Sequence, residues 1–172
     1  MHFTYNLYGK CVIIRRIVHL YSAACVFLRP RLILEKMENK RICAVTMLRK
    51  DDFFLEKWVT YYGGQLGREN LYIYFDGDDQ EVPAFCGGCN TSLQPKIKAA
   101  NVVQLEKARL AFLSDRAAEL LASGYDMVIG VDVDEFLIPD PQCGMGLAEF
   151  LSRNAGTSVC LSGLGIDVGE NL

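Results

Sequence analysis

Short apolar runs alternate with amphipathic stretches through most of the chain. The apolar runs predict strands at ICAVTM (42–47), LYIYFD (71–76), DMVIGVDVD (126–134) and SVCLSG (158–163), with a further short strand near 102–105. Apolar residues recur at helical spacing in 52–62, 106–123 and 147–153, which predicts three helices. Strands that alternate with helices indicate an α/β fold, with a mostly parallel open sheet flanked by helices.

Glycines and apolar stripes define the expected ends and buried faces of these helices. Gly63 and Gly64 are expected to end the first helix, and Gly124 the second. Residues 77–100 are expected to be mostly loop. The second helix is expected to bury one stripe, formed by Leu110, Leu113, Ala117, Leu120 and Leu121.

A basic leader, residues 1–40, precedes the body at 41–172. Within it, residues 11–28 are long enough for a membrane span, but Arg15, Arg16 and His19 interrupt the apolar run. Helical spacing of the apolar residues predicts a basic amphipathic helix instead. Such a helix has two alternative roles: peripheral contact with an anionic membrane surface, or packing on its own domain or a partner.

Charge divides unevenly between the two parts of this 172-residue chain. Residues 1–41 carry eight basic and two acidic residues, whereas residues 42–172 carry ten basic and nineteen acidic ones. An acidic body is a poor binder of phosphate backbones, so nucleic acid is not an expected partner.

Seven cysteines are scattered along the chain, and two of them, Cys86 and Cys89, form a CxxC in a predicted loop. This usage indicates a reducing compartment. The expected location is therefore cytoplasmic, with the inner face of the membrane as one option.

The common chemistries of α/β proteins lack their motifs here. No GxGxxG follows the first strand, no GK[ST] is present, and the body has no histidine. Carboxylates, arginines and hydroxyls remain as candidate functional groups. Three predicted strands end in polar residues, at 46–49, 76 and 132–135, and open parallel sheets bind ligands at the carboxyl ends of their strands.

The strand VIGVDVDEF ends in three carboxylates within four residues. In an extended chain Asp132 and Asp134 point to the same side, and their charges repel. No basic residue lies nearby in sequence, so a divalent cation is the expected neutralising partner. Hard oxygen ligands with open positions suit Mn²⁺ or Mg²⁺, which also bind substrate phosphates. The alternative is that these are solvated carboxylates at a strand end.

The body resembles glycosyltransferases of the family 2 type, which have the GT-A fold, and is similar to a bacterial subgroup with a DVDEF strand end. The matching stretches are ICAVTMLRKDDFFLEKWVTYYGGQLG, NLYIYFDGDDQ, YDMVIGVDVDEFLIPDP and LSGLGIDVGEN. They cover roughly residues 41–172, and the leader lies outside the resemblance.

This resemblance implies a nucleotide-sugar donor and an acceptor that is an unidentified glycan, lipid or protein. It implies that Thr46, Arg49 and Asp76 contact the donor nucleotide, and that Asp132 and Asp134 hold Mn²⁺ or Mg²⁺ against its diphosphate. Arg116 could also approach the phosphates, although a solvated arginine on a helix face is the alternative.

The chain differs from members of this family after the DxD motif, Asp132 to Asp134. Members carry their acceptor-binding part and catalytic base there, whereas this chain continues for about forty residues, with Asp167 and Glu170 as late carboxylates. The acceptor part is therefore expected to be missing. A truncated or inactive nucleotide-sugar-binding remnant is one alternative function, and a haloacid-dehalogenase-like phosphatase, whose DxD usually closes the first strand, is another.

Overall fold

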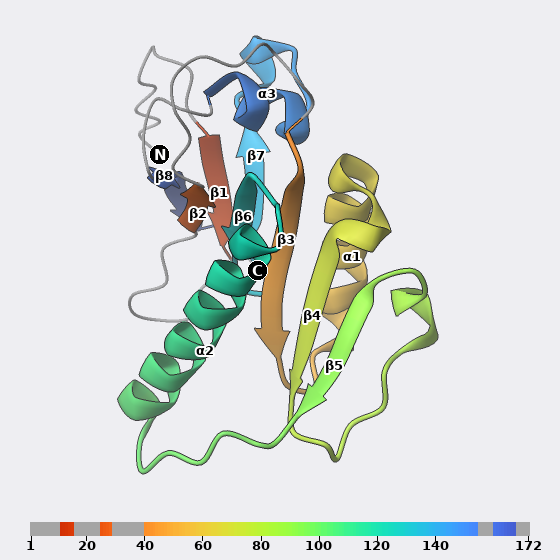
Figure 1. The fold of residues 1–172 in the computed structure, drawn as a ribbon, viewed down its shortest axis with the longest axis vertical. Coiled ribbons are helices and arrows are strands. Elements are labelled where there is room, and N and C mark those ends of the chain that lie inside the picture. The colour runs from red at the N-terminus through yellow and green to blue at the C-terminus, as the bar shows by residue number, and fades with distance from the viewer. Residues whose placement is uncertain (1–10, 16–24, 29–39, 155–159, 168–172) are drawn as a thin grey trace, which may run out of the picture.

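The computed structural model describes residues 11–15, 25–28, 40–154 and 160–167. Two sheets contain the strands (Figure 1). The larger has the order β5-β4-β3-β6-β2-β8, and the smaller has the order β7-β1-β9. The strands of the larger sheet are β5 (Asn90–Gln94), β4 (Leu71–Asp76), β3 (Ile42–Leu48), β6 (Met127–Gly130), β2 (Cys25–Leu28) and β8 (Cys160–Ser162). Those of the smaller are β7 (Phe136–Pro139), β1 (Cys11–Arg15) and β9 (Leu164–Asp167).

Four neighbouring strands of the larger sheet, β5, β4, β3 and β6, are all parallel. This open parallel sheet, flanked by helices, confirms the predicted α/β class and is compatible with a Rossmann-like fold. The antiparallel strands β2 and β8 extend it beyond β6.

Helices cover the two faces of the parallel sheet. Strand β3 is buried along its whole length, and its alternate residues serve two cores. Ile42, Ala44 and Leu48 pack with α1 (Asp52–Leu66) and α3 (Leu147–Asn154), whereas Cys43 and Val45 pack with α2 (Val102–Ala122). A strand buried on both faces reads as a continuous apolar run, which is why this strand is visible in the sequence.

The predicted leader helix over 11–28 is wrong where the structure describes it. Cys11–Arg15 and Cys25–Leu28 are strands, β1 and β2, and residues 16–24 lie outside the described residues. The runs CVIIR and CVFL are rich in β-branched and apolar residues, and they pair with β7 and β6 of the body. Backbone pairing with the body therefore outweighs the helical spacing of the apolar positions.

Three further boundaries differ from the predictions. Helix α1 continues through Gly63 and Gly64 and ends before Gly67, whose φ of 86° is a left-handed conformation that favours glycine. The predicted strand near 102–105 is the first turn of α2, because the side chain of Asn101 caps this helix by accepting from the Gln104 amide at 2.9 Å. Within the expected loop 77–100, Asn90–Gln94 is strand β5, and residues 84–86 form a 3-10 helix.

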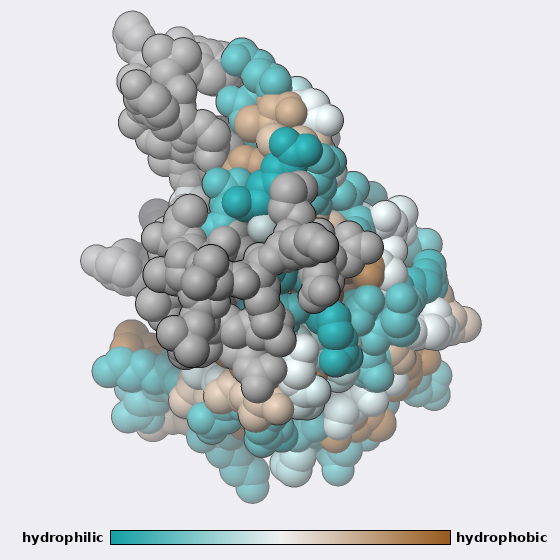
Figure 2. Space-filling view, turned by 45° about the horizontal axis from the view of Figure 1, so that its top comes forward, coloured by the Kyte–Doolittle hydropathy of each residue, from teal (hydrophilic) through white to brown (hydrophobic). Residues whose placement is uncertain are grey.

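The carboxyl ends of β3, β4 and β5 meet at one edge of the sheet, where α1 and α2 also begin (Figure 1). We call this edge the carboxyl edge. Figure 2 shows the molecule with the opposite end of the sheet turned toward the viewer. Many of the described residues visible there are hydrophilic. No helix among the described residues combines the length and the apolarity that a membrane crossing requires.

Candidate functional site at the carboxyl edge

Arg49 links the turn after β3 to the turn after β4. Its guanidinium donates to both carboxylate oxygens of Asp79 at 2.7 Å and to the carbonyl of Asp76 at 2.6 Å. This bidentate pair holds the pKa of Asp79 well below its usual range. Gly77 lies beneath it with a φ of 118°, which favours glycine, and a Cβ there would displace the guanidinium. Arg49 therefore has a structural partner at the position where the resemblance implies nucleotide contact.

Asp76 lies next to this link but is turned inward. It is buried, and its Oδ1 accepts from the backbone amide of Ile97 at 2.7 Å. The carboxylate thus fixes the segment between β5 and α2 against the end of β4. The structure brings Arg49 and Asp76 together, as predicted, while the role of either residue in nucleotide binding stays a prediction.

Thr46, the third predicted nucleotide contact, lies inside the sheet and is not exposed at the carboxyl edge. Its side chain is completely buried within β3, and its alternation with Ala44 and Leu48 directs it to the α1 face. Its Oγ1 has no hydrogen-bond partner among the described residues. Burial of the side chain argues against direct contact with a donor in this conformation.

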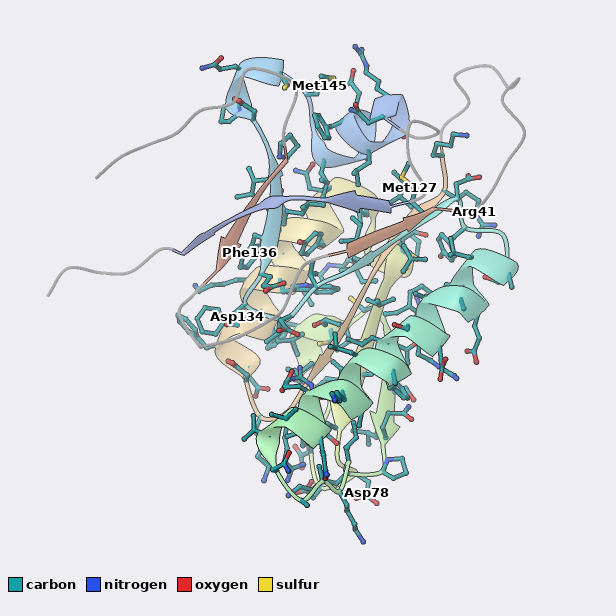
Figure 3. All side chains as sticks on the ribbon, turned by 90° about the vertical axis from the view of Figure 1, so that its left-hand side faces the viewer. Arg41, Asp78, Met127, Asp134, Phe136 and Met145 are labelled. Carbon is teal, nitrogen blue, oxygen red and sulfur yellow. The ribbon has the colours of Figure 1, made fainter. Side chains whose placement is uncertain are left out.

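The acidic motif forms a turn rather than an extended strand end. Strand β6 ends at Gly130, and the amide of Glu135 donates to the carbonyl of Asp132 at 3.0 Å, which closes a turn over 132–135. Val133 and Glu135 are buried, whereas Asp132 and Asp134 are partly exposed. The two aspartates are thus available to solvent at the carboxyl edge. Figure 3 places Asp134 at the far end of β6 from Met127.

Helix α1 fixes the chain directly after this turn. The buried hydroxyl of Tyr62 donates to the carbonyl of Glu135 at 3.3 Å and accepts from the amide of Leu137 at 2.8 Å. Tyr61 donates to the carbonyl of Leu137 at 2.7 Å. These contacts between α1 and the start of β7 hold the acidic turn in one position relative to the sheet.

Arg109 is the residue of this site that the sequence did not indicate. It lies on α2 and donates to the carbonyl of Met47 at 2.8 Å, and its guanidinium also forms ion pairs with Glu106 at 3.1 Å and with Asp132 at 3.5 Å. The expectation that nothing except a metal ion neutralises the aspartates is therefore incomplete. Arg109 precedes the motif by 23 positions in the chain, so only tertiary structure brings the two together.

The turn keeps excess negative charge despite Arg109. The pKa of Asp134 is raised, first by burial and then by the nearby carboxylates of Asp132 and Asp51, and Arg109 offsets only part of this effect. Asp51 caps the N-terminus of α1, where its side chain accepts from the amide of Phe54. From this position its negative charge acts on Asp134. A cation at this position would therefore relieve a repulsion that the protein alone leaves in place.

The donor set of this turn fits Mn²⁺ or Mg²⁺. Such ions are commonly held by one or two carboxylates together with waters and substrate phosphates, and Asp132 and Asp134 would be the protein ligands here. No group of three or more His, Cys, Asp or Glu side chains suited to a metal gathers in the described parts of the chain.

Comparison of the chain with protein-family models, curated proteins and solved structures finds no match.

Other candidate residues lie elsewhere. Arg116 forms an ion pair with Glu119 at 2.6 Å, on the same helix face. Cys86, the last residue of the 3-10 helix Ala84–Cys86, and Cys89 are free thiols, and burial raises the pKa of Cys86 to about 11. Asp167 ends β9, with its side chain outside the described structure, and Glu170 lies outside the described residues.

Proposed function

We propose that residues 41–172 form a nucleotide-sugar-binding domain of the GT-A type, in a metal-dependent glycosyltransferase. The observation that carries this proposal is the partly exposed acidic turn at the carboxyl edge of a parallel sheet, where Asp132 and Asp134 lie two positions apart and Arg109 pairs with Asp132. The motif stretches that resemble family 2 glycosyltransferases add a donor class to this geometry. A cytoplasmic location follows from the cysteine usage and stays part of the proposal.

In this proposal Asp132 and Asp134 hold Mn²⁺ or Mg²⁺ against the diphosphate of the donor. The ion would act as a Lewis acid that stabilises the charge developing on the leaving nucleoside diphosphate. The protein's contribution is to hold the turn in place: Tyr62 holds the backbone after it, while Arg109, bonded to the end of β3, pairs with Asp132 when no ion is bound.

Arg49 and Asp76 have a positioning role in this proposal. Through Asp79 and Ile97 they fix the two loops that border the end of β4, and these loops are the expected neighbours of the base and ribose. Thr46 supports the same edge from inside the sheet. The acceptor, whether glycan, lipid or protein, is not specified by any described residue.

The test is calorimetric binding of nucleoside diphosphates with and without MnCl₂, followed by assay of donor hydrolysis. We expect binding that requires Mn²⁺, and we expect Asp134→Asn to lower it by at least roughly tenfold, because one of two anionic ligands is lost. Asp115→Asn is the matched control, since Asp115 is an exposed carboxylate on α2 outside the turn. It should bind like the wild type.

Three results would redirect the proposal. Binding that is equal with and without Mn²⁺, or unchanged in Asp134→Asn, would refute the metal role of the turn. Metal-dependent binding without any turnover of sugar nucleotides would identify a binding remnant. Cleavage of aryl phosphates would identify a phosphatase instead.

A further inference from the structure

Cys86 and Cys89 lie at the two ends of a tight β-turn. The amide of Cys89 donates to the carbonyl of Cys86 at 2.9 Å. Between them, Gly87 has a φ of −53° and a ψ of 129°, and Gly88 has a φ of 87°. These angles match a type II turn, whose third residue takes a positive φ that favours glycine. The Cα atoms at the ends of such a turn lie within about 7 Å of each other, so the turn brings the two cysteines together.

The two thiols share one environment. Both are free, Cys86 is buried in the apolar core on the α1 side of the sheet, and the partly exposed Cys89 packs against the same core. Burial raises the pKa of both thiols, and the charge of Cys89 raises the pKa of Cys86 further, as only a nearby group can. The pair therefore forms a two-sulfur group at the border of the core.

Arg68 places a positive charge beside this pair. Its Nη1 donates to the carbonyls of Phe85 and Gly87, at 2.7 and 3.0 Å, and these two residues flank Cys86 in the chain. The guanidinium charge lowers the pKa of both thiols and so opposes the larger effect of burial. A cation held in this position favours the thiolate forms and offsets negative charge on the two sulfur atoms.

We propose that Cys86 and Cys89 bind Cu(I), a soft monovalent cation, through their two sulfur atoms. Thiolates are the ligands that select Cu(I), and this closed-shell ion is satisfied by two sulfur ligands. A structural Zn²⁺ site requires four ligands, whereas no group of three or more His, Cys, Asp or Glu side chains gathers in the described parts of the chain. A pair of thiolates therefore completes a site for Cu(I) but not one for Zn²⁺.

The charges balance at this site. Each thiol releases its proton when the ion binds, so Cu⁺ and two thiols give a bis-thiolate complex with one net negative charge and two protons. The guanidinium of Arg68 offsets that charge, which lowers the cost of holding the complex beside the core. The apolar surroundings of Cys86 also limit the access of solvent to the ion.

The pair lies away from the proposed donor site. Cys89 directly precedes β5, and the other end of this strand lies at the carboxyl edge (Figure 1). Binding of Cu(I) depends on the two thiols and Arg68, and it does not require the proposed glycosyltransferase function.

The experiment is an anaerobic titration of the full chain, kept reduced with a phosphine, in which the protein competes with the chromogenic chelator bicinchoninate for Cu(I). We expect the wild type to withdraw one equivalent of Cu(I) from the chelator and to develop ultraviolet thiolate-to-copper absorption. Cys89→Ser and Cys86→Ser should each lower the affinity by at least roughly a hundredfold, because one of the two ligands is lost. Cys89→Ser is the decisive variant, since Cys89 is partly exposed and its replacement should leave urea unfolding nearly unchanged.

Cys143→Ser is the matched control, because Cys143 is another partly buried free thiol, at the end of the 3-10 helix Pro141–Cys143. It should bind Cu(I) like the wild type. Failure of the wild type to compete with the chelator, or full retention of the bound equivalent by Cys89→Ser, would overturn the proposal. Tighter binding of Zn²⁺ than of Cu(I) would overturn the assignment of the ion. Asp134→Asn should bind Cu(I) normally, and Cys89→Ser should bind nucleoside diphosphates with Mn²⁺ normally, which separates this test from that of the donor site.

Discussion

Replacement of Arg109 by glutamine tests how the site is held together. Arg109 is 22% exposed and donates to the carbonyl of Met47 at 2.8 Å, a hydrogen bond from a charged donor that contributes about 1.5–3 kcal/mol. The ion pair with Glu106 is partly exposed, and the pair with Asp132 is long, so each adds at most ~0.5 kcal/mol. Glutamine can recover part of the hydrogen bond. We expect a loss of about 2 kcal/mol in the free energy of unfolding.

The same variant should bind Mn²⁺ more tightly. Removal of a positive charge beside Asp132 removes a competitor of the ion, and Coulomb's law at the dielectric of water gives about 1 kcal/mol for charges this close. The expected gain is roughly fivefold in affinity for MnCl₂ alone, measured by calorimetry. Urea unfolding of the same preparation gives the stability. The two readouts should therefore move in opposite directions.

Two further variants make this test specific. Arg116→Gln removes an arginine from α2 that pairs with Glu119, so it should leave Mn²⁺ affinity unchanged and lower stability by less than 1 kcal/mol, as is typical of an exposed pair. Arg109→Lys keeps the charge and should return Mn²⁺ affinity toward the wild-type value. If Arg109→Gln weakened Mn²⁺ binding, or left unfolding unchanged, Arg109 would not act as the competitor and anchor inferred from its contacts.

Two predictions concern the interior. Thr46→Val should stabilise the protein by about 1 kcal/mol, because it keeps the shape of the side chain and removes a buried hydroxyl that lacks a hydrogen-bond partner among the described residues. A loss of stability in urea unfolding would mean that the hydroxyl is hydrogen-bonded. Burial raises the pKa of Cys43 from 9.0 to about 12, so above pH 9 the unfolded chain loses this proton and the native protein retains it. The stability advantage of the wild type over Cys43→Ala should therefore decline as pH rises above 9, by at most ~1.4 kcal/mol per pH unit, and a constant difference would contradict this assignment.

The parallel sheet was predictable because its inner strands are buried on both faces. Continuous apolar runs mark β3 and β6. Strand β3 was predicted to within one residue of its observed bounds, whereas β6 ends at Gly130, four residues before its predicted end. Strand β5 was missed because Asn90–Gln94 is largely polar and partly exposed, as an edge strand can be. The leader strands were missed because periodicity within a segment carries no information about the strands with which it pairs.

The place of the acidic residues at the carboxyl edge was predictable, but the turn that they form and the ion pair with Arg109 were not. Local sequence places Asp132 and Asp134 two positions apart, whereas the turn that presents them depends on Tyr62 and its contacts with the backbone. The burial of Thr46 was not predictable because the end of a predicted strand does not reveal how deep its last residues lie. Arg109 required the packing of α2 on β3, which no local spacing encodes.

The partners of the arginines bear on how an anionic donor could bind at this edge. Arg49 is bound to both oxygens of Asp79, and Arg109 is shared between a carbonyl and two carboxylates, so neither guanidinium offers uncommitted positive charge. A diphosphate that approached the acidic turn alone would meet the carboxylates of Asp132 and Asp134, and Arg109 is already paired with Asp132. Direct capture by arginine would have to break one of these links. Binding through a divalent cation keeps both links and neutralises the turn, which is why the proposed function predicts metal-dependent rather than arginine-dependent affinity for nucleoside diphosphates.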